Sequence, residues 1–223
     1  GIDEDGHVTS AYDIALMSRE LLTKHPNIIK YTTIWMDSLR DGKSQLVNTN
    51  KLIKTYRGIT GLKTGSTSLA LYNLSASATR DNLSLIGVIM KAPSTKVRFA
   101  EAQKLLDYGF NKFSFKSFGN SGDVIQTVSI NKGVKNHVDA ILQNSVGTLI
   151  EKGKENQVAQ TVEINDNIEA PIKKGDVIGK VVFSLDSSEL SSTNLVASCD
   201  VDKITLFTMA KKVIYSWVDL LRS

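Results

Sequence analysis

The chain has 223 residues, of which 41% are hydrophobic and 22% charged, and its formal net charge is +4. Such a chain is an ordinary globular protein of one large or two small domains, with a core large enough to need neither disulfides nor a structural metal. Its basic residues are scattered without interleaved stacking aromatic residues, which argues against nucleic acid as a partner.

Cysteine and histidine usage indicates no metal site. Cys199 is the single cysteine, and the three histidines, His7, His25 and His137, lie far apart in the sequence. None of them has the spacing of a metal-ligand motif. We therefore expect neither a metal nor another cofactor.

The first residues form a polar stretch that leads directly into a helix pattern. Ser10 and Asp13 are typical of a capping box, and His25-Pro26 ends the helix. Apolar residues recur between them at helical spacing: Ile14, Met17, Leu21 and Leu22. No signal peptide precedes this helix and no run of 18 apolar residues follows it. A polar loop that leads straight into a helix is what the middle of a protein looks like, and the missing leader gives no information about export.

Strand patterns follow the first helix. The turn signal Asp41-Gly42 predicts a β-hairpin of residues 32–39 and 44–47. Residues 61–67, 71–78 and 83–90 then predict three antiparallel strands in series. Ser94 is expected to cap a helix that Gly109 ends. Residues 1–112 are thus predicted to form helices packed on an antiparallel sheet.

The texture changes after residue 112. Short strand-like runs are separated by glycine-containing turns, and they cover residues 124–130, 138–142, 147–151, 157–164, 177–185 and 195–201. Strands at such regular spacing predict a small all-β sandwich or barrel.

The clearest candidate for an active-site motif is the segment Lys63-Thr64-Gly65-Ser66-Thr67. A lysine followed by small residues is common, but this one lies on a predicted strand, before two more strands and a helix that carries Arg98. K-T-G is the third active-site motif of penicillin-binding proteins and serine β-lactamases, after S-x-x-K and S-x-N.

The ordered blocks of the sequence resemble the serine-type D-alanyl-D-alanine carboxypeptidases, which are S11-like low-molecular-weight penicillin-binding proteins. The blocks are Ser10–Leu16, Val47–Leu52, Gly61–Thr67, Tyr72–Leu74 and Leu105–Phe110. The resemblance implies an α+β fold in three parts. Residues 1–112 would be part of the penicillin-binding/β-lactamase-like catalytic domain, 113–202 an all-β sandwich, and 203–223 an amphipathic membrane-anchoring helix.

The resemblance also implies a role for each residue of the segment. A peptidoglycan stem peptide ending in D-Ala-D-Ala, or a β-lactam antibiotic, would lie along this strand, where Gly65 lets a backbone approach closely. Lys63 would supply positive charge beside the nucleophile, and the N–H of Ser66 an oxyanion-hole donor. The terminal carboxylate would be bound by Thr64, Thr67 and Arg98.

The nucleophile motifs themselves are not in place. Ser129-Ile130-Asn131-Lys132 and Ser192-Thr193-Asn194 match S-x-x-K and S-x-N, but they lie in the wrong domain and the wrong order, and chance explains them. We therefore expect a missing N-terminal segment of the same protein to carry both motifs. Residues 71–78 and 83–90 are expected to have apolar faces that either this segment or another chain covers. This chain alone is expected to be inactive.

The last residues have one apolar stripe at spacings of three and four, formed by Leu206, Phe207, Ala210, Val213, Ile214, Trp217, Val218 and Leu221. This pattern suits a helix lying on an anionic membrane surface, which would place the protein on the outer face of the cytoplasmic membrane. A helix facing a protein core has the same periodicity.

Two functions remain open from the sequence. The first is acyl transfer in peptidoglycan maturation and cell-shape control, by a carboxypeptidase or, within the same chemistry, a β-lactamase or transpeptidase. The second is a non-catalytic cell-wall or membrane-binding module.

Overall fold

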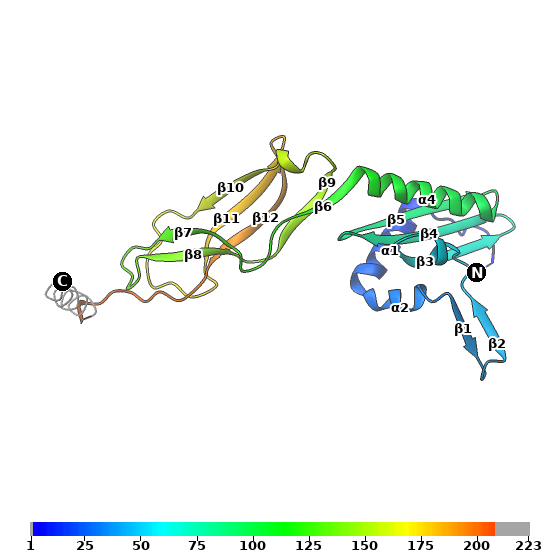
Figure 1. Cartoon of the computed structure of the whole chain (residues 1–223), viewed down its shortest axis with the longest axis horizontal. Helices are drawn as coiled ribbons and strands as arrows, with labels where there is room; N and C mark the ends of the chain where they lie inside the picture. The colour runs from blue at the N-terminus through cyan, green and yellow to red at the C-terminus, as the bar shows by residue number, and fades with distance from the viewer. Residues whose placement is uncertain (1, 208–223) are drawn as a thin grey trace. The chain divides into compact units, whose positions relative to one another are not determined.

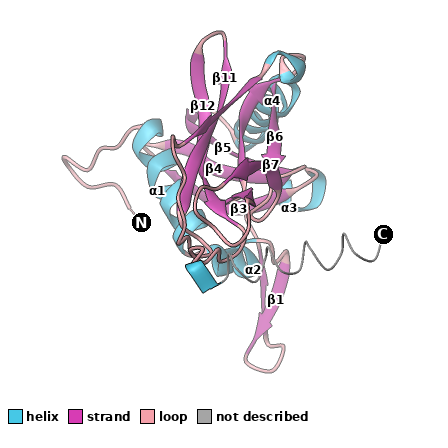
Figure 2. Cartoon of the chain, turned by 90° about the vertical axis from the view of Figure 1, so that its left-hand side faces the viewer, coloured by secondary structure: helices cyan, strands magenta, loops and turns pink. Residues whose placement is uncertain are grey.

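The computed structural model describes residues 2–207, and the chain divides into two compact units between Phe115 and Lys116. The first unit combines helices with strands, whereas strands dominate the second (Figures 1 and 2). A mixed helix and sheet fold, as predicted, is confirmed.

The first helix begins at a capping box. α1 (Ala11–Lys24) starts where the N–H of Asp13 donates to Ser10 Oγ at 3.1 Å and the N–H of Ser10 donates to Asp13 Oδ2 at 3.2 Å. These two bonds satisfy N–H groups that have no partner within the helix, and the acid suits the positive helix end. The chain then turns through the 3₁₀ helix η1 (Pro26–Ile28), so the predicted stop at Pro26 is confirmed.

The predicted hairpin is present but shorter than expected. β1 (Met36–Leu39) pairs with β2 (Ser44–Val47) across a turn in which Arg40, Asp41 and Gly42 have positive φ. Residues 32–35 were predicted to begin the first strand, which is wrong. Thr32 is instead the last residue of the short helix α2 (Ile29–Thr32), and its hydroxyl donates to the carbonyl of Thr60 at 2.6 Å.

Three antiparallel strands form the sheet of the first unit, as predicted. β3 (Ile59–Thr67), β4 (Leu71–Arg80) and β5 (Leu83–Ala92) pair in that order, so β3 lies at one edge. The helix α4 (Thr95–Lys112) covers one face of this sheet and α1 lies against the other (Figure 1). The core between the sheet, α4 and the short helix α3 (Leu52–Thr55) consists of Leu52, Tyr56, Leu74, Ala76, Ala78, Leu83, Phe99, Ala102, Leu106 and Phe110.

Ser94 caps α4 as predicted, but Gly109 does not end it. The N–H of Val97 donates to Ser94 Oγ at 3.3 Å, and the helix continues to Lys112. Gly109 is buried against Leu85, whose Cδ1 would lie 2.5 Å from a Cβ added at this position. The glycine is therefore explained by close packing of helix on strand rather than by helix termination.

Between Lys116 and Ile204, the second unit contains strands and, apart from loops and turns, only the short 3₁₀ helix η2 (Glu155–Gln157). Its strands are β6 (Phe113–Gly119), β7 (Val124–Ser129), β8 (His137–Leu142), β9 (Val146–Glu151), β10 (Ala159–Ile164), β11 (Val177–Leu185) and β12 (Ser188–Ala197). They form a five-stranded antiparallel sheet in the order β10-β11-β12-β8-β7 and a two-stranded sheet of β6 and β9. The rings of Phe118 and Phe183 stack with centroids 4.3 Å apart. The sequence did not predict β6 or residues 188–194 of β12.

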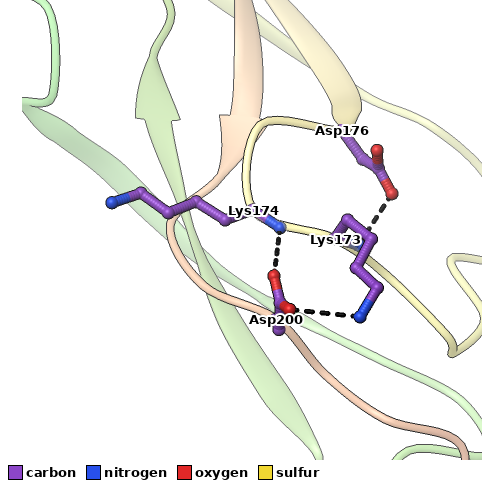
Figure 3. A network of polar contacts seen from close by, with 4 residues as sticks. All are labelled: Lys173, Lys174, Asp176 and Asp200. Carbon is purple, nitrogen blue, oxygen red and sulfur yellow. Dashed lines mark hydrogen bonds and ion pairs between the residues drawn. The ribbon is translucent and has the colours of Figure 1, made fainter.

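A polar network ties the segment after β12 to the turn before β11 (Figure 3). Lys173 Nζ lies 3.1 Å from Asp200 Oδ2, and the N–H of Lys174 donates to Asp200 Oδ1 at 2.7 Å. These contacts lower the pKa of Asp200, the bond from Lys174 most, and raise the pKa of Lys173. The N–H of Lys173 also donates to Asp176 Oδ2 at 2.8 Å, which closes the turn.

The predicted amphipathic helix of residues 203–223 lies almost entirely outside the described residues, so it stays a prediction. Within residues 2–207, no helix combines the length and the apolar character that crossing a bilayer requires.

Candidate active site

The KTG segment occupies the free edge of the sheet. Lys63 pairs with Ser75 of β4 and Gly65 pairs with Asn73, while the other side of β3 has no neighbouring strand among the described residues. An edge strand presents backbone N–H and C=O groups that can pair with an added chain. The sequence therefore places small residues and a lysine where an extended peptide can bind.

A cavity of about 420 Å³ lies beside this strand, lined largely by apolar side chains. α1 supplies Met17, Ser18 and Leu21 to its wall, and β3 supplies Lys63, Thr64 and Gly65. Of the six predicted site residues, these three are thus brought together at one cavity. Ser66, Thr67 and Arg98 do not line it.

Lys63 and Thr64 lie on the two sides of their strand. Lys63 is exposed, and its Nζ donates to the carbonyl oxygen of Thr64. The side chain of Thr64 is buried, and its hydroxyl shares a hydrogen bond with that of Thr49. An exposed ammonium group and a buried hydroxyl are thus available next to each other.

Gly65 and Ser66 leave the strand open to approach. A Cβ added at Gly65 would meet no atom within 4 Å, and Ser66 is exposed. The open space at Gly65 is what close approach of a second backbone requires.

Thr67 already has partners for its hydroxyl. Its Oγ1 donates to Asp3 Oδ1 at 2.6 Å and accepts a hydrogen bond from the N–H of Ala70 at 3.0 Å. To donate to a substrate, this hydroxyl would have to leave Asp3.

Arg98 is buried beneath the strand, with 5% of its surface exposed. Its Nη1 donates to the carbonyl oxygens of Asn73 at 3.2 Å and Gly65 at 3.5 Å, and its guanidinium lies over the rings of Phe99 and Tyr72. Burial lowers the pKa of this guanidinium. Its Nε is buried without a hydrogen-bond partner, and the salt bridges of the described residues do not include it. A buried cation without a carboxylate partner adds positive potential under β3.

Sequence reasoning missed several residues around the segment. Asn50 is 1% exposed, donates to the carbonyl of Gly61 at 3.2 Å and accepts from the N–H of Leu52, so it fixes the loop that carries Thr49. This loop belongs to a block that the resemblance includes, which was the available signal. Asp3 lies in a polar stretch with no pattern of its own, and nothing local to it indicates a contact with Thr67.

Two protein families account for most of the chain. Residues 1–94 match the family described as D-alanyl-D-alanine carboxypeptidase, and residues 113–203 match the C-terminal domain of penicillin-binding protein 5. The two matches follow each other in the same order as the two units.

Individual relatives align with nearly the whole of this chain. The chain is 36% identical to D-alanyl-D-alanine carboxypeptidase DacF of Bacillus subtilis, over 97% of this chain and 57% of that protein. It is 36% identical to DacA of Haemophilus influenzae, over 93% of this chain and 53% of that protein. The chain thus spans little more than half the length of these relatives.

A solved structure shares the fold. The crystal structure of penicillin-binding protein 5 from Haemophilus influenzae superposes with a TM-score of 0.70 at 34% identity, and covers 91% of this chain and 59% of that one. Together with the two family matches and the KTG strand, this similarity confirms the resemblance seen in the sequence. The chain belongs to the S11-like D-alanyl-D-alanine carboxypeptidases, the low-molecular-weight penicillin-binding proteins.

Proposed function

We propose that this chain contributes the KTG half of a serine carboxypeptidase site that removes the terminal D-alanine from peptidoglycan stem peptides. The observation that carries the proposal is the position of Lys63, Thr64 and Gly65, on an open sheet edge and at one cavity. The relatives named as D-alanyl-D-alanine carboxypeptidases support the same activity.

The substrate would extend β3 as an added strand, because the edge is free and Gly65 leaves room for a second backbone. Such pairing fixes the register of the substrate on β3, and with it the position of the scissile amide. β-Lactam antibiotics would bind to the same place, in keeping with the name of the Haemophilus penicillin-binding protein.

The chemistry needs a serine from a segment upstream of this chain. That serine would attack the carbonyl carbon of the penultimate D-alanine, and the C–N bond would break as the leaving D-alanine takes up a proton. Water would then hydrolyse the acyl-serine ester and free the enzyme. The N–H of Ser66 would stabilise the oxyanion, a contact whose loss typically costs about 3–4 kcal/mol, and Lys63 would add positive charge near the nucleophile.

The terminal carboxylate of the peptide would be held by Thr64 and by the potential of Arg98. Both side chains are buried close to Gly65, and the cationic Arg98 has no carboxylate partner among the recorded ion pairs of residues 2–207. Thr67 could join them only by releasing Asp3.

The upstream segment would also cover apolar surface. The sequence predicts exposed apolar faces on β4 and β5, but the larger exposure is on α1, where Tyr12 is 71% and Met17 58% exposed. Apolar surface of this kind usually lies against another part of a protein. We propose that the segment with the nucleophile packs on α1 and completes the wall of the cavity.

Release of D-alanine tests the proposal. The full-length gene product should release D-alanine from a stem pentapeptide and take up labelled penicillin, whereas residues 1–223 alone should do neither. Lys63→Ala should remove most of the acylation, and Lys96→Ala, which changes an exposed lysine of α4, should leave it unchanged. Penicillin bound covalently to the 223-residue chain would contradict the half-site, and a full-length protein that binds peptidoglycan without turnover would favour the binding module.

A further inference from the structure

The carboxylate of Asp3 holds the turn that follows the KTG strand. Besides the 2.6 Å bond from Thr67, its Oδ2 accepts hydrogen bonds from Ser68 Oγ and from the N–H of Leu69, each at 3.3 Å. Asp3 precedes α1 and lies 64 residues before Thr67 in the sequence. Three donors of one turn thus converge on one distant carboxylate.

The bond to Thr67 fixes more than one side chain. A threonine hydroxyl has a single proton, which Asp3 accepts, while its oxygen accepts from the N–H of Ala70. The turn between β3 and β4 is therefore closed through Thr67 and fastened from outside by Asp3. Hydrogen bonds to an ionised carboxylate are roughly twice as strong as neutral ones.

We infer that Asp3 is a positioning residue for the KTG strand, which it holds at its C-terminal end through Thr67 and the following turn. The inference rests on the proposed function, because it matters only if β3 binds a substrate. Thr67 is the neighbour of Ser66, whose N–H would meet the oxyanion, so a turn free to move would displace that donor. A second consequence is that Thr67 holds the strand and does not bind the substrate carboxylate.

Hydrogen exchange on the 223-residue chain tests the structural step. Asp3→Asn should speed exchange of the Leu69 and Ala70 amides by about tenfold or more, and Thr67→Val should do the same at Ala70. Thr67→Ser, which keeps the hydroxyl, should preserve protection. Asp5→Asn removes a different, exposed carboxylate of the same segment and should change neither amide.

Acylation of the full-length gene product tests the positioning step. Asp3→Asn should lower the second-order rate constant for labelled penicillin by about tenfold while the protein stays folded at the assay temperature, and Asp5→Asn should not lower it. Thr67→Ser should restore the rate that Thr67→Val loses.

Each outcome decides a different point. Unchanged exchange at Leu69 and Ala70 in Asp3→Asn would overturn the inference, whether or not the protein is an enzyme. Faster exchange with an unchanged acylation rate would reduce Asp3 to a local brace and refute its positioning role. A wild-type full-length protein that takes up no penicillin would overturn the proposed function, and the positioning role with it, while the exchange comparison still decides whether Asp3 holds the turn.

Discussion

Arg98 of α4 donates a hydrogen bond to the backbone carbonyl of Asn73 in β4 at 3.2 Å, and so joins a helix to the strand beside the KTG segment. The same Nη1 reaches Gly65 of β3. The guanidinium of Arg98 thus binds two residues that pair with each other across β3 and β4, from the face of the sheet that α4 covers.

We expect Arg98→Lys to lower the free energy of unfolding by about 2–3 kcal/mol, because an ammonium group provides neither the planar fork nor the stacking on Phe99. Urea unfolding of the 223-residue chain measures this, with Arg19→Lys at an exposed position of α1 as the control.

In the full-length product, Arg98→Ala should weaken the binding of substrates with a free carboxylate more than that of amide analogues. Equal losses for both substrates would show that Arg98 only braces the strands.

Gly109→Ala should destabilise the first unit although alanine is the better helix former. The gain in helix propensity is about 1 kcal/mol, but the new methyl would meet Leu85 Cδ1 at 2.5 Å, and such overpacking costs about 1–3 kcal/mol. Asn111→Ala, on the exposed side of α4, should not destabilise. Thermal unfolding of the wild type, Gly109→Ala and Asn111→Ala measures these effects. Leu85→Ala should lower the free energy of unfolding less in the Gly109→Ala protein than in the wild type, because it makes room for the new methyl group.

Tyr56 is expected to make the free energy of unfolding fall as the pH rises in the alkaline range. Burial, together with its 2.7 Å hydrogen bond to Asp107, raises the pKa of Tyr56 to about 12, compared with about 10 when unfolded. Folding therefore favours the neutral phenol. Its contribution is complete below pH 10 and declines as the pH rises from about 10 to about 12, by about 2–3 kcal/mol in all. Urea midpoints between pH 9 and 12 should fall more steeply for the wild type than for Tyr56→Phe, and parallel curves would refute this.

Residues 203–223 give a prediction that rests on their sequence alone. If residues 203–223 form an interfacial helix, the full chain should sediment with anionic vesicles and a chain ending at Lys203 should not. Replacing Lys211 and Lys212 by glutamine should weaken binding by roughly 1 kcal/mol per charge. Both chains remaining in solution at low salt would show that the helix does not bind the membrane surface.

Local patterns predicted the elements that local chemistry determines. The capping box at Ser10 and Asp13 was readable because both partners lie within one turn, and the turn at Asp41-Gly42 was readable because positive φ favours such residues. β6 was missed because it follows α4 without a break, Phe113 being the residue after Lys112.

The candidate site was predictable in its strand but not in its surroundings. Lys63, Thr64 and Gly65 form a compact motif, whereas the contact of Asp3 with Thr67 joins positions 64 residues apart. Arg98 illustrates the same limit, because an arginine in a helix pattern gives no sign that it will be 5% exposed and bonded to strand carbonyls. Only the packing of α4 on the sheet determines that.

The bridges at the end of the second unit determine where mechanical tension enters it. Val201 exchanges two backbone hydrogen bonds of 2.9 Å with Ile172, and the N–H of Ile204 donates to the carbonyl of Lys132 at 2.7 Å. A pull on the chain beyond Ile204 is therefore resisted by two separate segments at once, with Lys173 and Asp200 reinforcing one of them. These bonds must break before the segment after β12 can be pulled away, so a load applied there is shared with the segments that precede β11 and follow β7.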